Sequence, residues 1–411
     1  SFRFNLRGGI MMTEGRMSLT VHVLLFCLAL GAVFASSTGE SSSIPVFDLT
    51  PLEPIIDARA NVYGHNEPVQ DWHGTLSGRS PFFYDGNTLQ FDPEWNELIH
   101  TFPLRWLRFH MGNTYAWKDA VGPIQMRKPF RTTYGILRTE VGLDEFLRWA
   151  ESLPEPPIVS LISSPIRDPQ ENADLVAYCN STEGPMAEWR AINGHPAPYN
   201  VCHWELGNEV DWIKRQDEDI MRVDEPYEYS VEDYIELCRE TIQAMRAVDP
   251  TIKIYAHAKT APWSITQPNW PHWHREVIKE LGHLIDGIVI HPYYEGYTVP
   301  YCLQSIDTVI ADIHALGPKD RQLTVWVNEH ARWTPNLDDN TTWVQTGGLQ
   351  GAISTADFLM ELMIRPEVEA ANYWAYGHRG PWQVLNADWE NNASPKFGTG
   401  IYHLYHLLNE A

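Results

Sequence analysis

Two glutamates stand directly after short apolar segments that have the character of buried strands. The segment 201–206 runs into Asn208 and Glu209, and the segment 323–328 runs into Glu329. If both strands belong to one barrel, their carboxyl ends meet at the same mouth. Two carboxyl groups there can cleave a glycosidic bond, because one donates a proton to the leaving oxygen while the other attacks as an anion. Glu209 alone would be interpreted as a solvated loop carboxylate, but with Glu329 it predicts this chemistry.

The elements that must position these glutamates are strands alternating with helices. Helix-like stretches at 143–151, 231–247, 273–281 and 349–364 separate short β-branched segments typical of strands covered on both faces. About eight such units over this length predict an α/β fold, the (β/α)8 TIM barrel with enlarged loops. An open doubly wound sheet is the alternative, but no glycine-rich phosphate-binding sequence follows any strand. The expected strands are 45–50 or 54–62, then 104–109, 157–163, 201–206, 252–257, 285–291, 323–328 and 370–375.

Composition excludes several classes of partner. The 411 residues carry 53 acidic and 30 basic side chains, a net charge of −23, which argues against nucleic acid and anionic membranes. The chain has 17 Trp, more than a core needs, and this suggests flat faces on which a ligand stacks. We expect a poly- or oligosaccharide partner and neither a metal nor an organic cofactor, and the oligomeric state stays open.

The N-terminal region has the pattern of a targeting segment. An apolar run over 21–34 follows Met17, and it is shorter than the roughly 20 residues that a membrane-spanning helix needs. We therefore expect a secreted, extracellular protein without stable membrane insertion after signal removal; an uncleaved membrane anchor is the alternative. The expected organisation is upstream residues at 1–16, a signal peptide at 17–35, a polar linker at 36–44 and a catalytic barrel at 45–411.

Cysteines and sequons fit that expectation. After residue 35 the cysteines are four, an even number that allows up to two disulfides in an oxidising compartment, although four free thiols are equally compatible. No C-x-x-C spacing occurs, which argues against structural zinc. Glycosylation sequons begin at Asn180 and Asn340, and Asn392 begins a poorer one. The four cysteines are Cys179, Cys202, Cys238 and Cys302.

Several motifs together resemble a known enzyme family. The run 204–209 (WELGNE) resembles the strand-four signature of clan A glycoside hydrolases, and 196–209 is similar to glycoside hydrolase family 51, the α-L-arabinofuranosidases and related endoglucanases. The segments 108–113 and 142–146 agree with that family. The resemblance implies a (β/α)8 barrel. Because the sequence ends at Ala411, we expect this barrel without the family's complete C-terminal β-sandwich.

The resemblance also implies roles for individual residues. Glu209 would be the general acid/base and Glu329 the nucleophile, while Asn208 would bind the sugar 2-hydroxyl. Arg108 would keep the nucleophile ionised. The other substrate-binding candidates are Tyr293 or Tyr294 beside the nucleophile, Trp374 as a stacking platform, Asn113, Trp117, His257 and His291.

Each of these candidates also has a structural alternative. Arg108 could pair with a buried carboxylate for structural reasons alone, and Trp374 could simply fill the barrel. His257 and His291 could be hydrogen-bonded structural histidines. A Trp-rich cleft would suit a polysaccharide; its candidate side chains are Trp117, Trp212, Trp263, Trp270, Trp273, Trp333 and Trp382.

The sequence therefore predicts a secreted retaining glycoside hydrolase that acts by double displacement. Its substrate would be a plant or algal-type polysaccharide or its side chains, with arabinofuranosidase-like or endo-β-glycanase-like action. Two alternatives come from other classes. One is a non-catalytic carbohydrate-binding protein, and the other is an extracellular structural or filament protein built on the same barrel.

Overall fold

The protein is described here by a computed structural model that covers most of the chain after residue 92. The expected leader at 17–35, the linker at 36–44 and the first-strand alternatives 45–50 and 54–62 lie outside the described residues. The described residues are 63–68, 84–85, 90–91, 93–102, 104–110, 112–113, 115–132, 135–137, 141–212, 214–215, 227–259, 269–294, 299–333, 343–374, 382–386 and 396–410.

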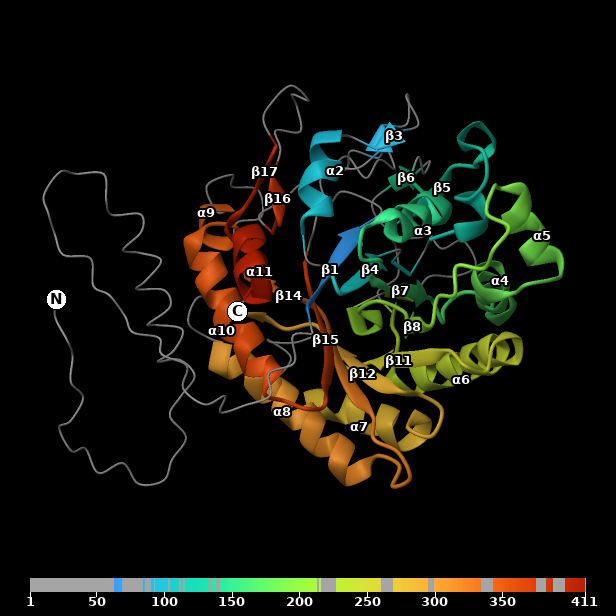
Figure 1. Ribbon diagram of the computed structural model, residues 1–411. Helices are drawn as coiled ribbons and strands as arrows, with labels where there is room; N and C mark the ends of the chain where they lie inside the picture. The colour runs from blue at the N-terminus through green and yellow to red at the C-terminus, as the bar shows by residue number, and fades with distance from the viewer. Residues whose placement is uncertain are drawn as a thin grey trace, which may run out of the picture.

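Eight parallel strands form a closed barrel at the centre of the molecule (Figure 1). Neighbouring strands pair in the order β12-β11-β8-β7-β4-β1-β15-β14, and pairing between β12 and β14 closes the ring. This confirms the predicted (β/α)8 architecture. The strands are β1 (Tyr63–Pro68), β4 (Trp106–His110), β7 (Ile158–Ser163), β8 (His203–Leu206), β11 (Lys253–His257), β12 (Gly287–Ile290), β14 (Thr324–Arg332) and β15 (Val368–Tyr373).

The first barrel strand is a correction to the sequence analysis. The strand that pairs with both β15 and β4 is β1, at 63–68, so the first barrel strand begins after both expected segments. Its sequence, YGHNEP, is polar and lacks the β-branched character that marked the other strands. Backbone pairing with two neighbours therefore fixes this strand where local propensity does not.

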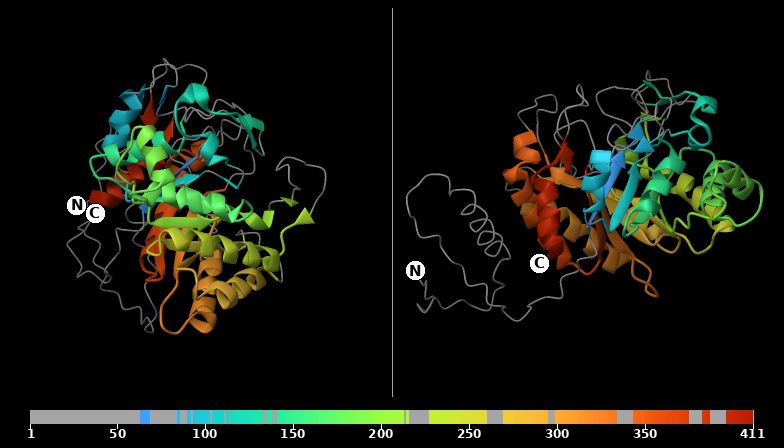
Figure 2. Two further views of the ribbon diagram at one scale, coloured as in Figure 1. Left: turned by 90° about the vertical axis from the view of Figure 1, so that its right-hand side faces the viewer. Right: turned by 45° about the horizontal axis from the view of Figure 1, so that its top comes forward.

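Helices lie outside the strands (Figure 2). Two of the helix starts are fixed by side-chain caps. The Ser230 hydroxyl accepts from the Asp233 N–H at the start of α6, and the Asp168 carboxylate accepts from the Gln170 N–H at the start of α4. The helices are α2 (Pro93–His100), α3 (Leu143–Ser152), α4 (Pro169–Asn180), α5 (Pro185–Ile192), α6 (Val231–Val248), α7 (Trp270–Leu281), α8 (Val299–Leu316), α9 (Trp343–Thr346), α10 (Leu349–Met363) and α11 (Gly400–Glu410).

Smaller elements decorate the loops. Strand β13 (Tyr293–Tyr294) pairs in parallel with the end of β14, and the other short strands form antiparallel pairs outside the barrel. The short strands are β2 (Tyr84–Asp85), β3 (Gln90–Phe91), β5 (Phe130–Thr132), β6 (Gly135–Leu137), β9 (Lys214–Arg215), β10 (Tyr227–Glu228), β16 (Leu385–Asn386) and β17 (Phe397–Gly398). Among the described helices, none combines the length and apolarity that crossing a membrane would require.

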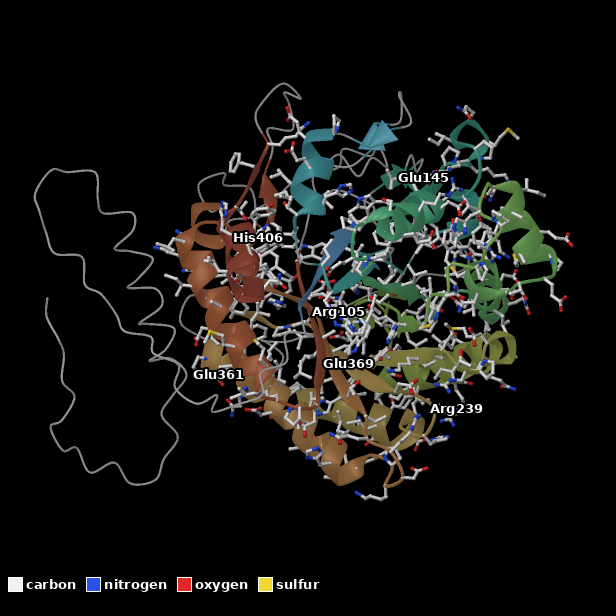
Figure 3. The ribbon with its side chains drawn as sticks, viewed as in Figure 1. Arg105, Glu145, Arg239, Glu361, Glu369 and His406 are labelled. Atoms are coloured by element: carbon white, nitrogen blue, oxygen red, sulfur yellow. The ribbon has the colours of Figure 1, made fainter. Side chains whose placement is uncertain are left out.

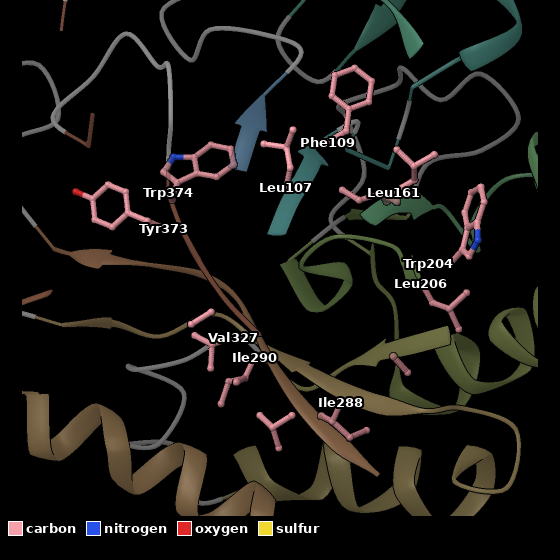
Figure 4. Close-up of a cluster of buried hydrophobic side chains, with 14 of the residues drawn as sticks. Leu107, Phe109, Leu161, Trp204, Leu206, Ile288, Ile290, Val327, Tyr373 and Trp374 are labelled. Carbon is pink, nitrogen blue, oxygen red and sulfur yellow. The ribbon is translucent and has the colours of Figure 1, made fainter. Parts of the chain in front are cut away.

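Alternation along each strand divides the core in two. Side chains such as Leu107, Phe109 and Trp204 belong to the large cluster between strands and helices (Figure 4). Phe109, for example, stacks on Phe146 of α3 with ring centroids 4.1 Å apart. Because successive strand residues face opposite sides, Arg108 points into the barrel. The interior apolar layer is a separate cluster made of Trp106, Tyr255, Val289, Trp326 and Ala370.

Candidate active site

A tight turn after β8 presents Glu209 at the mouth of the barrel. Gly207 has φ +81° and Glu209 has φ +46°, so the chain turns sharply through the left-handed region. Asn113 holds this turn from the loop after β4. Its amide nitrogen donates to the Asn208 carbonyl at 2.5 Å, and its amide oxygen accepts from the Asn208 N–H at 2.8 Å. The described structure therefore gives Asn113 a backbone-positioning contact.

The two predicted carboxylates meet at one place. Glu209 Oε1 lies 3.0 Å from His291 Nδ1, and Glu329 Oε1 lies 3.7 Å from the same nitrogen. Ligand-capable atoms of Glu209, His291 and Glu329 all lie within 4.8 Å of one another. Retaining glycosidases hold their two carboxyl groups about 5–5.5 Å apart, whereas inverting ones need about 6.5–9.5 Å. The upper limit of 4.8 Å between one oxygen of each carboxylate is compatible with the retaining spacing and is shorter than the inverting one.

Glu329 accepts two strong hydrogen bonds. Arg108 donates from Nη1 to Glu329 Oε1 at 2.7 Å, and the Tyr293 hydroxyl donates to Oε2 at 2.9 Å. Glu329 is nearly buried, and His110 Nε2 lies 3.6 Å from its Oε1. Hydrogen bonds of this kind hold a carboxylate in one orientation. Of the two tyrosines proposed for this contact, Tyr293 makes it.

Glu209 has different surroundings from Glu329. Burial raises the pKa of Glu209 to about 7, and it outweighs the opposing influence of His257 and Arg108. Burial also lowers the pKa of His291 to about 3, so this ring is neutral near pH 7. A carboxyl group beside a neutral imidazole keeps its proton near neutrality, as a general acid must.

Glu205 is the site residue that the sequence analysis missed. It is fully buried on β8, and it accepts from Arg108 Nε at 2.6 Å and from Arg108 Nη2 at 2.8 Å. His257 Nε2 lies 2.5 Å from Glu205 Oε1, and Asn328 donates to Oε2 at 2.8 Å. Alternation on β8 could have found it. Trp204 and Leu206 pack toward the helices, so Glu205 must face the interior, where a carboxylate needs a cation.

The remaining predicted residues separate into those near the carboxylates and those away from them. Asn208 accepts from Arg108 Nη2 at 2.8 Å. Trp374 is 2% exposed and lies against His110, with ring centroids 4.8 Å apart. Tyr294 points elsewhere, because its hydroxyl bonds Thr355 Oγ1 at 2.8 Å.

Of the described tryptophans that were expected to line a cleft, some lie in the core and two lie near Glu329. Trp117 packs against Tyr178 and Trp189 in the core, and its indole N–H donates to the Glu171 carbonyl. Trp270 and Trp273 are also core residues, and Trp263 and the side chain of Trp212 lie outside the description. Trp333 and Trp382 pack on each other and on Tyr293, beside Glu329.

Two groups of side chains here could in principle ligate a metal. They are Glu205 with His257 and His291, and Glu209 with His291 and Glu329. In both groups Arg108 already donates to a carboxylate, so a metal cation would compete with a buried guanidinium. Neutralised carboxylates suit acid/base work better than they suit a metal, and the expectation of no metal stays a prediction.

A closed (β/α)8 barrel with two glutamates at the ends of its fourth and seventh strands is the arrangement typical of clan A glycoside hydrolases. The family model described as the α-L-arabinofuranosidase 1 domain matches residues 105–295. Over these residues the chain is similar to glycoside hydrolase family 51, as the motifs at 108–113 and 204–209 indicated.

Curated relatives agree with this assignment. An intracellular exo-α-(1→5)-L-arabinofuranosidase of Acetivibrio thermocellus is 28% identical over 224 residues, which are 51% of this chain and 41% of that protein. The α-L-arabinofuranosidase C of Emericella nidulans is 30% identical over 255 residues, which are 56% of this chain and 48% of that protein. The chain thus spans less than half the length of either relative.

Solved structures support the fold. A family 51 α-L-arabinofuranosidase from Bifidobacterium longum has a TM-score of 0.69 at 17% identity, covering 86% of this chain and 73% of that one. The α-L-arabinofuranosidase from Thermotoga maritima, solved with arabinose, has a TM-score of 0.67 at 21% identity, covering 85% and 70%. At these identities the likeness establishes the barrel.

The expectation of a secreted, extracellular protein is wrong by this comparison. Several of the matching relatives, among them those of Acetivibrio thermocellus, Streptomyces lividans and Bacillus subtilis, are named as intracellular enzymes. An apolar run with the length of a signal peptide does not by itself establish where a protein is located, because the pattern is short and unspecific.

Two further marks of secretion also lack support. All four cysteines among the described residues are free, which supports the alternative of four free thiols over disulfides. Asn180 uses its amide group inside the fold: its nitrogen donates to the Val201 carbonyl and to Asp249, and its oxygen accepts from the Val201 N–H. A glycan there would break these bonds. Asn340 and Asn392 lie outside the described residues.

Proposed function

We propose that the protein is a retaining glycoside hydrolase that removes α-L-arabinofuranosyl residues from arabinose-containing poly- or oligosaccharides. The observation that supports this proposal most is the proximity of Glu209 and Glu329. One carboxylate oxygen of each lies within 4.8 Å of the other and of a ring nitrogen of His291, and the two carboxylates have different hydrogen-bond partners. The sugar class comes from the curated relatives, which are named arabinofuranosidases.

In the first step of the proposed reaction, a Glu329 oxygen attacks the anomeric carbon and the glycosidic bond breaks. Glu209 gives its proton to the departing oxygen, and a glycosyl ester on Glu329 results. In the second step Glu209, now ionised, takes a proton from water as that water attacks the same carbon. Glu329 leaves as a carboxylate, so the product keeps the substrate's anomeric configuration.

Arg108, Tyr293 and Asn113 serve this reaction by positioning. Arg108 and Tyr293 fix the plane of the attacking carboxylate, and Asn113 fixes the turn that carries Glu209. Trp333, half-buried beside Tyr293, offers an aromatic surface near Glu329 for an apolar sugar face.

The decisive test compares the wild type with Glu329→Ala on aryl α-L-arabinofuranosides, aryl glucosides and aryl xylosides. We expect wild-type hydrolysis of the arabinofuranoside with retained configuration by NMR, and a loss on the order of 10⁴-fold in the variant. Added azide should restore turnover in Glu329→Ala with an inverted glycosyl azide as product, because azide replaces the missing nucleophile.

Three results would contradict the proposal. They are unchanged activity in Glu329→Ala, an inverted wild-type product, and equal binding of arabino-oligosaccharides with no release of reducing sugar. The last result would mark the barrel as a carbohydrate-binding protein. Glu367→Gln is the control, because this buried carboxylate pairs with the exposed His314 just before β15, away from the barrel mouth.

A further inference from the structure

A third carboxylate, that of Glu205, lies buried in the barrel near the two proposed catalytic carboxylates. Glu205 is fully buried on β8, and its carboxylate receives hydrogen bonds from strands β4, β11 and β14. Neither the attack on the sugar nor the proton transfer uses it. Burying a carboxylate costs desolvation free energy even when it has several polar partners, so a functional role is a reasonable hypothesis for it.

We propose that Glu205 is a positioning residue, which orients Arg108 toward Glu329 and sets the charge around the Glu209 acid. This inference rests on the proposed function, in which Glu329 is the nucleophile and Glu209 the acid. It concerns a residue that touches neither the sugar nor the reacting atoms, and it acts through Arg108 and His291.

The geometry at Arg108 supports the first part. Nε and Nη2 of Arg108 both donate to Glu205, to Oε2 and Oε1 respectively, so the guanidinium is gripped along one edge. This two-point contact fixes the guanidinium plane. The opposite nitrogen, Nη1, then lies 2.7 Å from Glu329 Oε1. Without Glu205, the same guanidinium could rotate about its side-chain bonds.

The position of His291 supports the second part. Its Nε2 lies 3.8 Å from Glu205 Oε1, and its Nδ1 lies 3.0 Å from Glu209 Oε1. For a neutral ring, the negative charge of Glu205 favours the hydrogen on Nε2. Nδ1 is then an acceptor, and it matches a protonated Glu209 as its donor.

The charges around Glu209 decide the direction of the effect. Arg108 and His257 favour its ionised form, while burial and the charge of Glu205 oppose ionisation. Removing the Glu205 charge leaves Arg108 without its compensating partner, so Glu209 should lose its proton at lower pH. The charged and titratable groups that face this site are Arg108 and His110 of β4, Glu205 of β8, His257 of β11, His291 after β12, Tyr293 of β13 and Glu329 of β14.

The test is a carboxyl-carbon NMR titration of protein labelled at the glutamate δ-carbon, which needs no substrate. The resonances of Glu209 and Glu329 are assigned by their absence from Glu209→Gln and Glu329→Gln. In Glu205→Gln we expect the Glu209 midpoint to fall by about one pH unit or more. Glu205→Asp keeps the charge but shortens the side chain; its Glu209 midpoint should stay near the wild-type value, while the Glu329 resonance shifts.

The matched control is Glu369→Gln. Glu369 is a second carboxylate on the barrel, on β15 (Figure 3), and it accepts from Thr324, Trp326 and Tyr255 at the opposite end. This variant should lose stability without moving the Glu209 midpoint. A merely structural role for Glu205 predicts that the two Gln variants behave alike, and that result would overturn the proposal.

If Glu205→Gln does not fold, Glu205→Asp decides, and a Glu329 resonance identical to wild type overturns the positioning role. Absence of hydrolysis by the wild type would refute the proposed function, yet it would leave these titrations interpretable. The two failures are therefore distinguishable.

Discussion

Glu209 and Glu329 carry the same functional group, and their neighbours give them different partners. Glu329 accepts from a guanidinium and a phenol, whereas the partly buried Glu209 lies against a neutral imidazole. At the scale of single residues, function is therefore assigned by the atoms within about one hydrogen-bond length of each carboxylate.

The adjacent tyrosines offer a matched pair of variants. Tyr293→Phe removes a hydrogen bond to a charged group, so we expect kcat/KM to fall about 10–100-fold, which corresponds to roughly 1.5–3 kcal/mol. Tyr294→Phe removes a bond to Thr355 and should alter the melting temperature more than kcat/KM. Steady-state kinetics and thermal unfolding of both variants check this. Equal kinetic losses would contradict the assignment.

Glu209 should also make stability depend on pH. Its folded pKa of about 7 lies above the ordinary value of 4.5, so the folded state binds the extra proton between these values. Stability that is complete below about pH 4.5 is therefore lost as pH rises through 7. Glu209→Gln removes this loss and should be more stable than wild type at pH 8, by on the order of 1–3 kcal/mol. Urea unfolding at pH 5 and pH 8 measures it; the same difference at both pH values would contradict it.

At the scale of elements, the turn after β8 depends on one glycine. A Cβ on Gly207 would lie 2.6 Å from Val210 Cγ2 and 3.0 Å from Asn113 Oδ1, in addition to the strain of its positive φ. Gly184 also has a positive φ, of +93°, but a Cβ there meets nothing within 4 Å. The two positions separate backbone strain from steric conflict.

We expect Gly184→Ala to cost about 1–3 kcal/mol from backbone strain alone, because φ +93° with ψ 175° is a conformation that glycine adopts almost exclusively. Gly207→Ala should cost more, and it should also displace Glu209 and reduce kcat. Denaturant unfolding with parallel kinetics tests both variants. Equal losses of stability with unchanged kcat would show that the close packing around Gly207 does not position the turn.

At the scale of the whole molecule, the barrel is filled below the active site by aromatic rings. Trp326 lies at the centre of this layer, with its ring centroid 4.0 Å from Tyr255, 5.0 Å from Trp106 and 5.4 Å from His203. These four side chains come from four different strands. The layer therefore joins opposite sides of the barrel, and it supports the polar residues above it.

Trp326→Ala should destabilise the fold by about 3–5 kcal/mol, because a large interior cavity replaces a fully buried ring. Ile192→Ala is the control, since its side chain is 82% exposed and should cost less than about 0.5 kcal/mol. Equilibrium unfolding in denaturant measures both values. A small loss in Trp326→Ala would mean that the strands collapse inward to fill the space.

The pattern of residues along the chain was enough to predict the barrel and the placement of both glutamates at its mouth. Apolar segments alternating with capped helices leave few topologies, and parallel strands bring their carboxyl ends together. Glu209 and Glu329 follow directly from that rule. The sequence pattern did not predict the polar strand β1, because backbone pairing with neighbouring strands holds it in place and its own residues have little strand propensity.

The side chains that complete the site could be identified only from the folded barrel. Strand register and barrel closure set the depth of each residue, and these depend on the packing of all eight strands at once. This is why Glu205 grips Arg108, why Tyr293 rather than Tyr294 reaches Glu329, and why Trp117 lies in the core. The spacing of residues along a strand predicts which face of the strand each side chain occupies. Which side chains touch one another inside the barrel depends on how the closed barrel packs.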